Sequence, residues 1–181
     1  MEESCLKFEN FEHEGDEDCW KNPSNCNKGV SLSIWERISF QRNDSTRRYI
    51  LSTGGKNEGI PGISLYYEGI TLHALVSTGE EKWYTYATGH LRNDTWNNIG
   101  IRWSPQSGLH VYVDAIHKAY VVYPEKTSGS VSSFTKTQLT IGCSRQEEAV
   151  YVDYATGELD EFAAWMWKLE TNEIAYFLGG F

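Results

Sequence analysis

Length, composition and charge exclude several classes of protein. The 181 residues suffice for one domain with a sizeable core, and the seven Trp and eleven Tyr favour β-strands. The formal net charge is −9, whereas proteins that bind nucleic acid or an anionic membrane need a basic surface. No stretch approaches the roughly 20 apolar residues of a membrane helix. We therefore predict neither a nucleic-acid partner nor insertion into a membrane.

The cysteines predict two disulfides. The chain has four of them, which permit three connectivities. Pro23 and the adjacent Asn and Ser residues predict a turn that brings Cys19 close to Cys26, which leaves Cys5 to pair with Cys143. The alternative is a zinc site, but the chain has no paired C-x-x-C motif and no histidine within ligand spacing of a cysteine. Disulfides indicate an oxidising compartment.

Two glycosylation motifs favour the same compartment. Asn43-Asp44-Ser45 and Asn93-Asp94-Thr95 lie in polar stretches between strand-like segments. The sequence Asn22-Pro23-Ser24 is not a glycosylation motif, because proline occupies its middle position. The acidic start Met1-Glu2-Glu3-Ser4 is unlike a signal peptide, and we interpret the chain as an excised ectodomain fragment with an added Met1. We predict an extracellular or cell-surface glycoprotein with glycans on Asn43 and Asn93.

Alternation of apolar and polar residues predicts strands from Val30 onward. Val30, Leu32 and Ile34 alternate with serines, so one face of this strand is buried and the other is solvated. The turn Glu68-Gly69 joins two further segments into a hairpin. In the first half of the chain, strands are expected at residues 30–34, 48–52, 63–67, 70–76 and 83–87.

The second half continues the pattern around a hairpin with its turn at Pro105-Gln106-Ser107-Gly108. Strands are expected at residues 96–103, 109–113, 118–123 and 139–143. Residues 126–134 are polar and predict a long loop, and residues 144–157 predict a polar excursion. Residues 159–167 are a long apolar run, which predicts a central strand.

The two ends of the chain depart from this pattern. Thr171 is expected to cap a short helix whose apolar face includes Ile174 and Leu178 and which stops at Gly179-Gly180. Residues 1–25 are expected to form an acidic segment packed on the surface of the sandwich. Short strands at regular spacing predict a β-sandwich or a jelly roll.

Several segments resemble one family. Residues 157–165, GELDEFAAW, look like the closing strand of laminin-G-like and pentraxin-like domains. In these domains an acidic helix follows that strand, and residues 169–174 resemble this helix. Residues 96–114 resemble the central hairpin of the family, and Leu139-Thr140-Ile141-Gly142 resembles its L-x-I-G strand. Residues 19–35 are similar to the module of adhesion G-protein-coupled receptors and related large receptors. The resemblance extends from about Cys19 to the end of the chain.

The resemblance implies an all-β fold, a concanavalin A-like jelly roll of two antiparallel sheets with a short C-terminal helix, over residues 1–181. It implies a non-enzymatic recognition or adhesion module of a cell-surface receptor or matrix protein that binds a protein or a glycan. One alternative is a calcium-dependent pentraxin-like lectin. A second alternative is a concanavalin A-like glycoside hydrolase.

Catalysis would require paired carboxylates on one face of a strand. The hydrolases of this fold carry an E-x-D-x-E-like strand, and Glu158 and Asp160 occupy its first two acidic positions. Phe162 occupies the third, and Glu161 points the other way unless a bulge intervenes. We therefore predict that the protein is not an enzyme.

Calcium sites need several oxygen ligands at one place. Three acidic clusters qualify, namely Asp16-Glu17-Asp18, Gln146-Glu147-Glu148 together with Asp153, and Asp160-Glu161. The second cluster lies where pentraxins place their calcium loops. The candidate ligands are Glu147, Glu148, Asp153 and Asp160, and calcium is the one cofactor considered.

Aromatic side chains are the candidate ligand contacts. Trp83, Tyr84 and Tyr86 lie in a run that cannot bury every ring on one face of a strand. Exposed rings on a sheet can stack on sugars or anchor a protein partner. A jelly roll also needs aromatic residues in its core, so we expect only a minority of these rings to contact a ligand.

Overall fold

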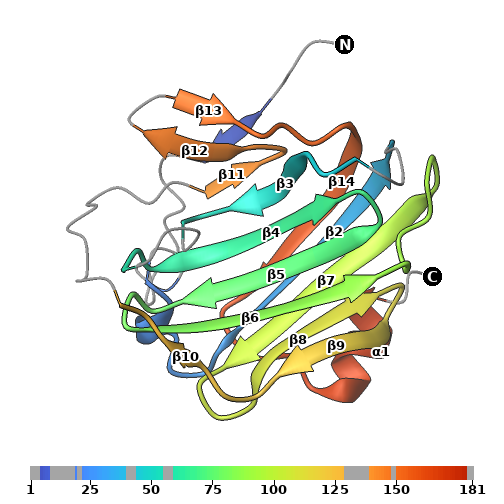
Figure 1. The fold of residues 1–181 in the computed structure, drawn as a ribbon. Coiled ribbons are helices and arrows are strands. Elements are labelled where there is room, and N and C mark those ends of the chain that lie inside the picture. The colour runs from blue at the N-terminus through green and yellow to red at the C-terminus, as the bar shows by residue number, and fades with distance from the viewer. Residues whose placement is uncertain are drawn as a thin grey trace.

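The structure is a sandwich of two antiparallel β-sheets (Figure 1). It is a computed structural model that describes residues 5–8, 19, 22–39, 44–54, 59–128, 139–147 and 150–178. The two packed sheets and the short C-terminal α-helix confirm the predicted all-β jelly roll.

The sheets have seven and five strands. The spatial order of the first is β1 (Leu6–Phe8), β11 (Leu139–Ile141), β3 (Arg47–Ser52), β4 (Gly62–Glu68), β5 (Thr71–Ser77), β6 (Glu81–Thr88) and β10 (Glu125–Lys126). The order of the second is β14 (Gly157–Trp165), β2 (Val30–Ile38), β7 (Trp96–Ser104), β8 (Gly108–Val113) and β9 (Ile116–Val121). The remaining elements are β12 (Ser144–Glu147), β13 (Val150–Val152), the 3-10 helix η1 (Pro23–Asn25) and α1 (Thr171–Leu178).

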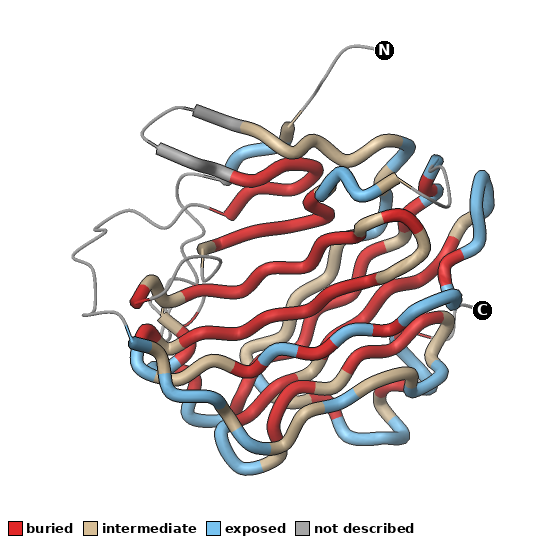
Figure 2. The backbone as a smooth tube through the Cα atoms, viewed as in Figure 1, coloured by how far each residue is buried: buried red, intermediate tan, exposed pale blue. Residues whose placement is uncertain are grey.

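One hydrophobic core fills the space between the sheets, and Figure 2 shows buried residues along the central strands of both. Trp83 of β6 and Trp103 of β7 meet edge to face with their ring centroids 5.1 Å apart. The two rings are 2% and 0% exposed, and the indole N–H of Trp83 donates to the carbonyl of Val122 over 3.1 Å. This pair therefore joins the two sheets at the centre of the core.

Helix α1 packs on the outer face of the five-stranded sheet. Leu178 lies over Gly100, where a Cβ would come within 2.5 Å of the leucine Cδ1, so the absence of a side chain in β7 makes room for the helix. The N–H of Glu170 donates to the Glu173 carboxylate over 2.7 Å. The helix begins at Thr171, so the prediction that Thr171 caps it is wrong by one position.

Two predictions about the last third of the chain need correction. Residues 144–157 are not a simple polar excursion, because β12 and β13 form a hairpin there. The strand predicted at 159–167 is β14, and it lies at the edge of its sheet instead of the centre. Its apolar run arises because Leu159 and Phe162 pack on the core while Trp165 contacts Phe177 of α1 on the other face.

Both predicted disulfides, Cys5–Cys143 and Cys19–Cys26, are present. Within the N-terminal segment, Leu6–Phe8 pair with β11 and extend the seven-stranded sheet. No helix in the part of the chain that the structure describes is long and apolar enough to cross a membrane.

Candidate functional site

A row of aromatic rings crosses the outer face of the seven-stranded sheet, away from the core. The strand register places Tyr49 of β3 opposite Tyr66 of β4, Tyr66 opposite His73 of β5, and His73 opposite Tyr86 of β6. Because directly opposed residues point to the same face, their rings form a continuous stack. Successive ring centroids lie 5.0, 4.7 and 6.1 Å apart.

The stack becomes more exposed toward β6. Tyr49 is 0% exposed, whereas Tyr86 is 59% exposed. Tyr84, two residues before Tyr86 in β6 and therefore on the same face, is 37% exposed, and its hydroxyl lies 2.8 Å from Nδ1 of His73. Burial lowers the pKa of His73, although the Glu68 carboxylate 3.9 Å from its Nε2 acts in the opposite direction. At the β6 end of the stack, the rings of Tyr84 and Tyr86 therefore face solvent next to the neutral imidazole of His73.

A polar row runs beside the rings. Arg47, Glu68, Thr71 and Thr88 are directly opposed on β3 to β6. The Arg47 Nε donates to the Glu68 carboxylate over 3.0 Å, and its guanidinium carbon lies 4.6 Å from the centroid of the Tyr66 ring. The hydroxyls of Thr71 and Thr88 are 3.2 Å apart. The sheet therefore carries an aromatic row and a parallel polar row on one face.

Parts of the two rows, on β4, β5 and β6, line an open groove of about 370 Å³. Its volume lies within the range of sites for small molecules. Besides Tyr84, Tyr86 and His73, the groove is lined by residues with oxygen-bearing side chains, namely Asp44, Ser45, Glu68, Thr71 and Thr88. Hydrogen bonds from Thr46 lower the pKa of Asp44 below its ordinary value, and the Arg48 guanidinium lowers it further. Asp44 is therefore ionised at neutral pH. The groove can therefore accept hydrogen bonds from a hydroxylated ligand while its rings contact an apolar face.

The structure separates the three aromatic candidates. Tyr84 and Tyr86 line the groove, whereas Trp83 points to the opposite face of β6, into the core, and is not accessible to a ligand. The other six lining residues were not predicted from the sequence as ligand contacts, namely Asp44, Ser45, Glu68, Thr71, His73 and Thr88. The turn at Glu68-Gly69 sets the register between β4 and β5, whereas Thr88 and Tyr86 reach the same face only through the pairing of β5 with β6.

Of the four candidate calcium ligands, the structure describes the side chains of Asp153 and Asp160. The Asp153 carbonyl accepts the N–H of Tyr49 over 2.8 Å, and the Asp160 carboxylate accepts the N–H of Glu161 over 2.8 Å. The described residues contain no group of three or more His, Cys, Asp or Glu side chains that could hold a metal ion. The side chain of Glu147 and all of Glu148 lie outside the described set, as does the cluster Asp16-Glu17-Asp18, and calcium binding stays a prediction.

The candidate glycosylation sites differ in what the structure describes. Asn93 is exposed in the turn before β7, where its side-chain amide donates to Asp94 over 3.0 Å. Asn43 lies outside the described residues. Glycans at both positions stay a prediction.

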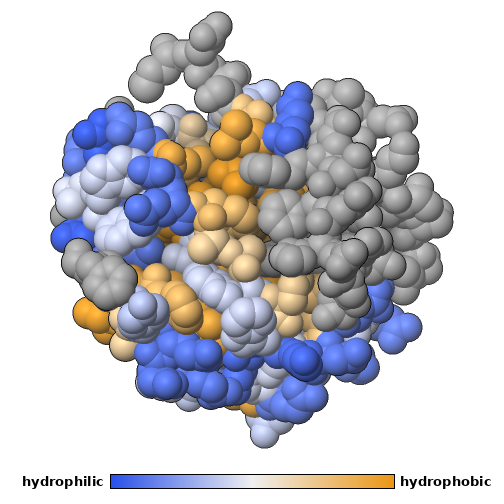
Figure 3. All heavy atoms as spheres, turned by 180° about the vertical axis from the view of Figure 1, so that it is seen from behind, coloured by the Kyte–Doolittle hydropathy of each residue, from blue (hydrophilic) through white to orange (hydrophobic). Residues whose placement is uncertain are grey.

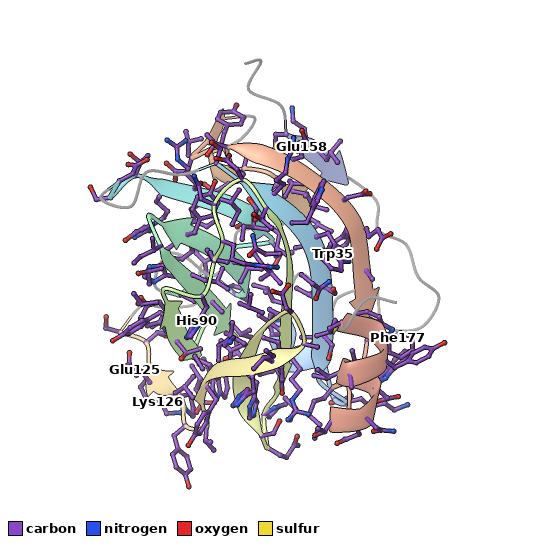
Figure 4. The ribbon with its side chains drawn as sticks, turned by 90° about the vertical axis from the view of Figure 1, so that its right-hand side faces the viewer. Trp35, His90, Glu125, Lys126, Glu158 and Phe177 are labelled. Carbon is purple, nitrogen blue, oxygen red and sulfur yellow. A yellow bond between two sulfur atoms is a disulfide. The ribbon has the colours of Figure 1, made fainter. Side chains whose placement is uncertain are left out.

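The candidate catalytic acids lie on the other sheet. Glu158 forms an exposed ion pair with Arg37, and Figure 4 shows it on the opposite side of the sandwich from Glu125, which lies in β10 beside β6. The strand register shifts between Asp160 and Ala163, and Phe162 packs on the core. These carboxylates therefore do not line the groove.

The comparisons identify the superfamily. A family model described as the concanavalin A-like lectin/glucanases superfamily matches residues 15–175. The chain belongs to this superfamily. The laminin-G-like resemblance is thereby confirmed. No curated protein matches the chain in sequence.

Solved structures of carbohydrate-binding and toxin domains share the fold. The CBM40 of the Ruminococcus gnavus IT-sialidase, bound to α2,3 sialyllactose, aligns with a TM-score of 0.64 at 12% identity over 84% of this chain and 83% of that one. The ligand binding domain of botulinum neurotoxin serotype D, in complex with N-acetylneuraminic acid, aligns at 0.57 and 14% identity over 82% of this chain. The binding domain of botulinum neurotoxin DC, in complex with rat synaptotagmin II, aligns at 0.57 and 11% identity over 84% of this chain. This chain spans 35% of each of these two toxin structures. At these identities the likeness is one of fold.

Proposed function

We propose that the protein is a non-catalytic extracellular recognition module that binds glycans in the groove over β4, β5 and β6. The observation that carries this proposal is the pair of solvent-facing rings, Tyr84 and Tyr86, beside a row of oxygen-bearing side chains. A sugar ring has an apolar face of C–H groups and a rim of hydroxyls, and the groove offers a partner to each. The sialyllactose and N-acetylneuraminic acid complexes of the structural neighbours support a carbohydrate ligand for this fold.

The wider context that we propose is an ectodomain of a cell-surface receptor or a matrix protein. The two disulfides support an oxidising, extracellular compartment. A protein ligand is the second candidate, and the synaptotagmin complex of a toxin domain with this fold supports it. A protein partner would engage the same exposed rings, because aromatic side chains are frequent anchors of protein interfaces.

Replacing Tyr86 by alanine is expected to weaken glycan binding at least tenfold, a loss of about 1.4 kcal/mol. Tyr86 is the most exposed ring of the groove, so its removal deletes a contact surface with little effect on the core. The measurement is a glycan array followed by calorimetric titration of the glycans that bind.

The matched control is Tyr120→Ala. Tyr120 is 61% exposed, close to the 59% of Tyr86, and lies in β9 at the edge of the other sheet. This variant is expected to bind as the wild type does. Equal losses in the two variants, or glycan binding that is indifferent to Tyr86, would place the glycan site elsewhere. Absence of binding to any glycan would turn the search to protein ligands.

A further inference from the structure

The charges around the groove restrict the kind of sugar that it can accept. Among the described residues that line it, the carboxylates of Asp44 and Glu68 are the charged groups, and no lysine or arginine lines it. The whole chain has a formal net charge of −9, so its long-range field also repels anions. A ligand carboxylate in the groove would lie close to these two acids, with no described cation lining the site to offset the repulsion.

Two arginines in the described part of the chain, Arg47 and Arg48, pair with the carboxylates that line the groove. Arg47 donates to Glu68 over 3.0 Å and lies over the Tyr66 ring. Arg48 lies 3.2 Å from the Asp44 carboxylate and donates to the carbonyl of Tyr154 over 3.4 Å. Because each of these arginines already pairs with a carboxylate that lines the groove, its positive charge is largely offset before an acidic ligand arrives.

His73 does not supply the missing cation. Its Nδ1 lies 2.8 Å from the Tyr84 hydroxyl, and its buried Nε2 has no hydrogen-bond partner among the described residues. Burial lowers its pKa, which keeps the ring neutral at neutral pH. If it were protonated, its Nε2 would face the Glu68 carboxylate at 3.9 Å, so the Glu68 charge and not that of a ligand would be neutralised.

The groove is instead rich in acceptors for hydroxyl donors. A carboxylate that accepts a hydrogen bond from a sugar hydroxyl forms a charge-assisted bond, which is stronger than a bond between neutral groups. We infer that the groove binds neutral glycans and discriminates against acidic ones, sialylated chains included. This inference rests on the proposed function, and it sets the protein apart from the structural neighbours that were solved with sialyllactose or N-acetylneuraminic acid.

The test compares pairs of glycans that differ only by a terminal sialic acid, printed together on one array and then titrated in solution at pH 7.4 and low salt. For each pair that the protein recognises through Tyr86, the neutral member is expected to bind at least tenfold more tightly. Equal or tighter binding of the sialylated member, still dependent on Tyr86, would overturn the inference and leave the proposed function standing. If no member of any pair showed binding that Tyr86→Ala weakens, the proposed function and the inference would both fail.

A charge variant tests the cause of the discrimination. Glu68→Gln removes one acid and releases Arg47, so it is expected to weaken binding of the neutral member and to reduce the ratio between the two members at least threefold. The matched control is Glu158→Gln, which breaks the Glu158–Arg37 ion pair on the other sheet and is expected to leave the ratio unchanged. A ratio that is the same in wild type and in Glu68→Gln would show that the acids of the groove do not select its ligand, which overturns the electrostatic account.

Discussion

Replacing Cys5 and Cys143 together by alanine is expected to lower the free energy of unfolding by about 5 kcal/mol, roughly twice the loss of about 2 to 3 kcal/mol expected for the Cys19 and Cys26 pair. A disulfide restricts the unfolded chain, and the restriction grows with the length of the closed loop. The two bridges join residues 138 and 7 positions apart. The longer bridge therefore constrains nearly the whole unfolded chain.

The measurement is unfolding in urea under oxidising conditions for the two double variants and the wild type. Cys19, Cys26 and Cys143 are all buried, so each variant also loses some packing. Reduced wild-type protein is the control for that loss, because it breaks both bridges and keeps every sulfur atom. Equal destabilisation by the two double variants would contradict the dependence on loop length.

The strands were predictable because their faces differ in polarity. The alternation at Val30, Leu32 and Ile34 continues into a strand that runs to Ile38, and the hairpin at Glu68-Gly69 has the expected turn. The position of β14 was not predictable from its apolar run. The last residue of β14, Trp165, contacts Phe177 of α1, and this tertiary contact gives an edge strand apolar residues on both faces, as in a central strand.

The groove was only partly predictable for a similar reason. The alternation of a strand places Tyr84 and Tyr86 on one face and Trp83 on the other, but it does not say which of the two faces is buried. Their partners come from β4 and β5, from Thr88 of β6 itself, and from the segment before β3. Which polar residues gather around a ring depends on the register between strands, and that register becomes definite only in the folded sheet.

A buried acid also escaped the sequence analysis. Glu36 follows Val30, Leu32 and Ile34 at the next core-facing position of β2 and is 0% exposed. Among the residues that the structure describes, neither of its carboxylate oxygens has a hydrogen-bond partner. Its cross-strand neighbour Asn97 is committed elsewhere, since its amide group bonds to the backbone of Arg92 and Thr95. Burial consequently raises the pKa of Glu36 well above its ordinary value.

This raised pKa makes stability fall as pH rises. Below the ordinary pKa of a glutamate, Glu36 is protonated in both the folded and the unfolded chain and contributes no pH dependence. Above that value the unfolded chain releases the proton while the folded chain retains it, so the unfolded state is favoured increasingly until the folded pKa is reached. The slope of this loss is at most about 1.4 kcal/mol per pH unit.

Glu36→Gln is therefore expected to raise the free energy of unfolding at pH 8 and to change it little at pH 4. Glutamine has nearly the same shape and does not ionise, so the gain isolates the cost of keeping this carboxyl away from water. Glu36→Met is expected to gain more, because it also removes the unpartnered polar atoms from the core. Urea unfolding between pH 4 and pH 8 measures both gains, with the exposed Glu158→Gln as the control for the loss of one acid at the surface.

A Glu36→Gln variant that is less stable than the wild type at every pH would mean that the carboxylate has a stabilising partner in the folded protein. A gain that grows with pH would instead identify Glu36 as an acid that the fold tolerates at the expense of stability, in a core that the two sheets otherwise fill with apolar side chains.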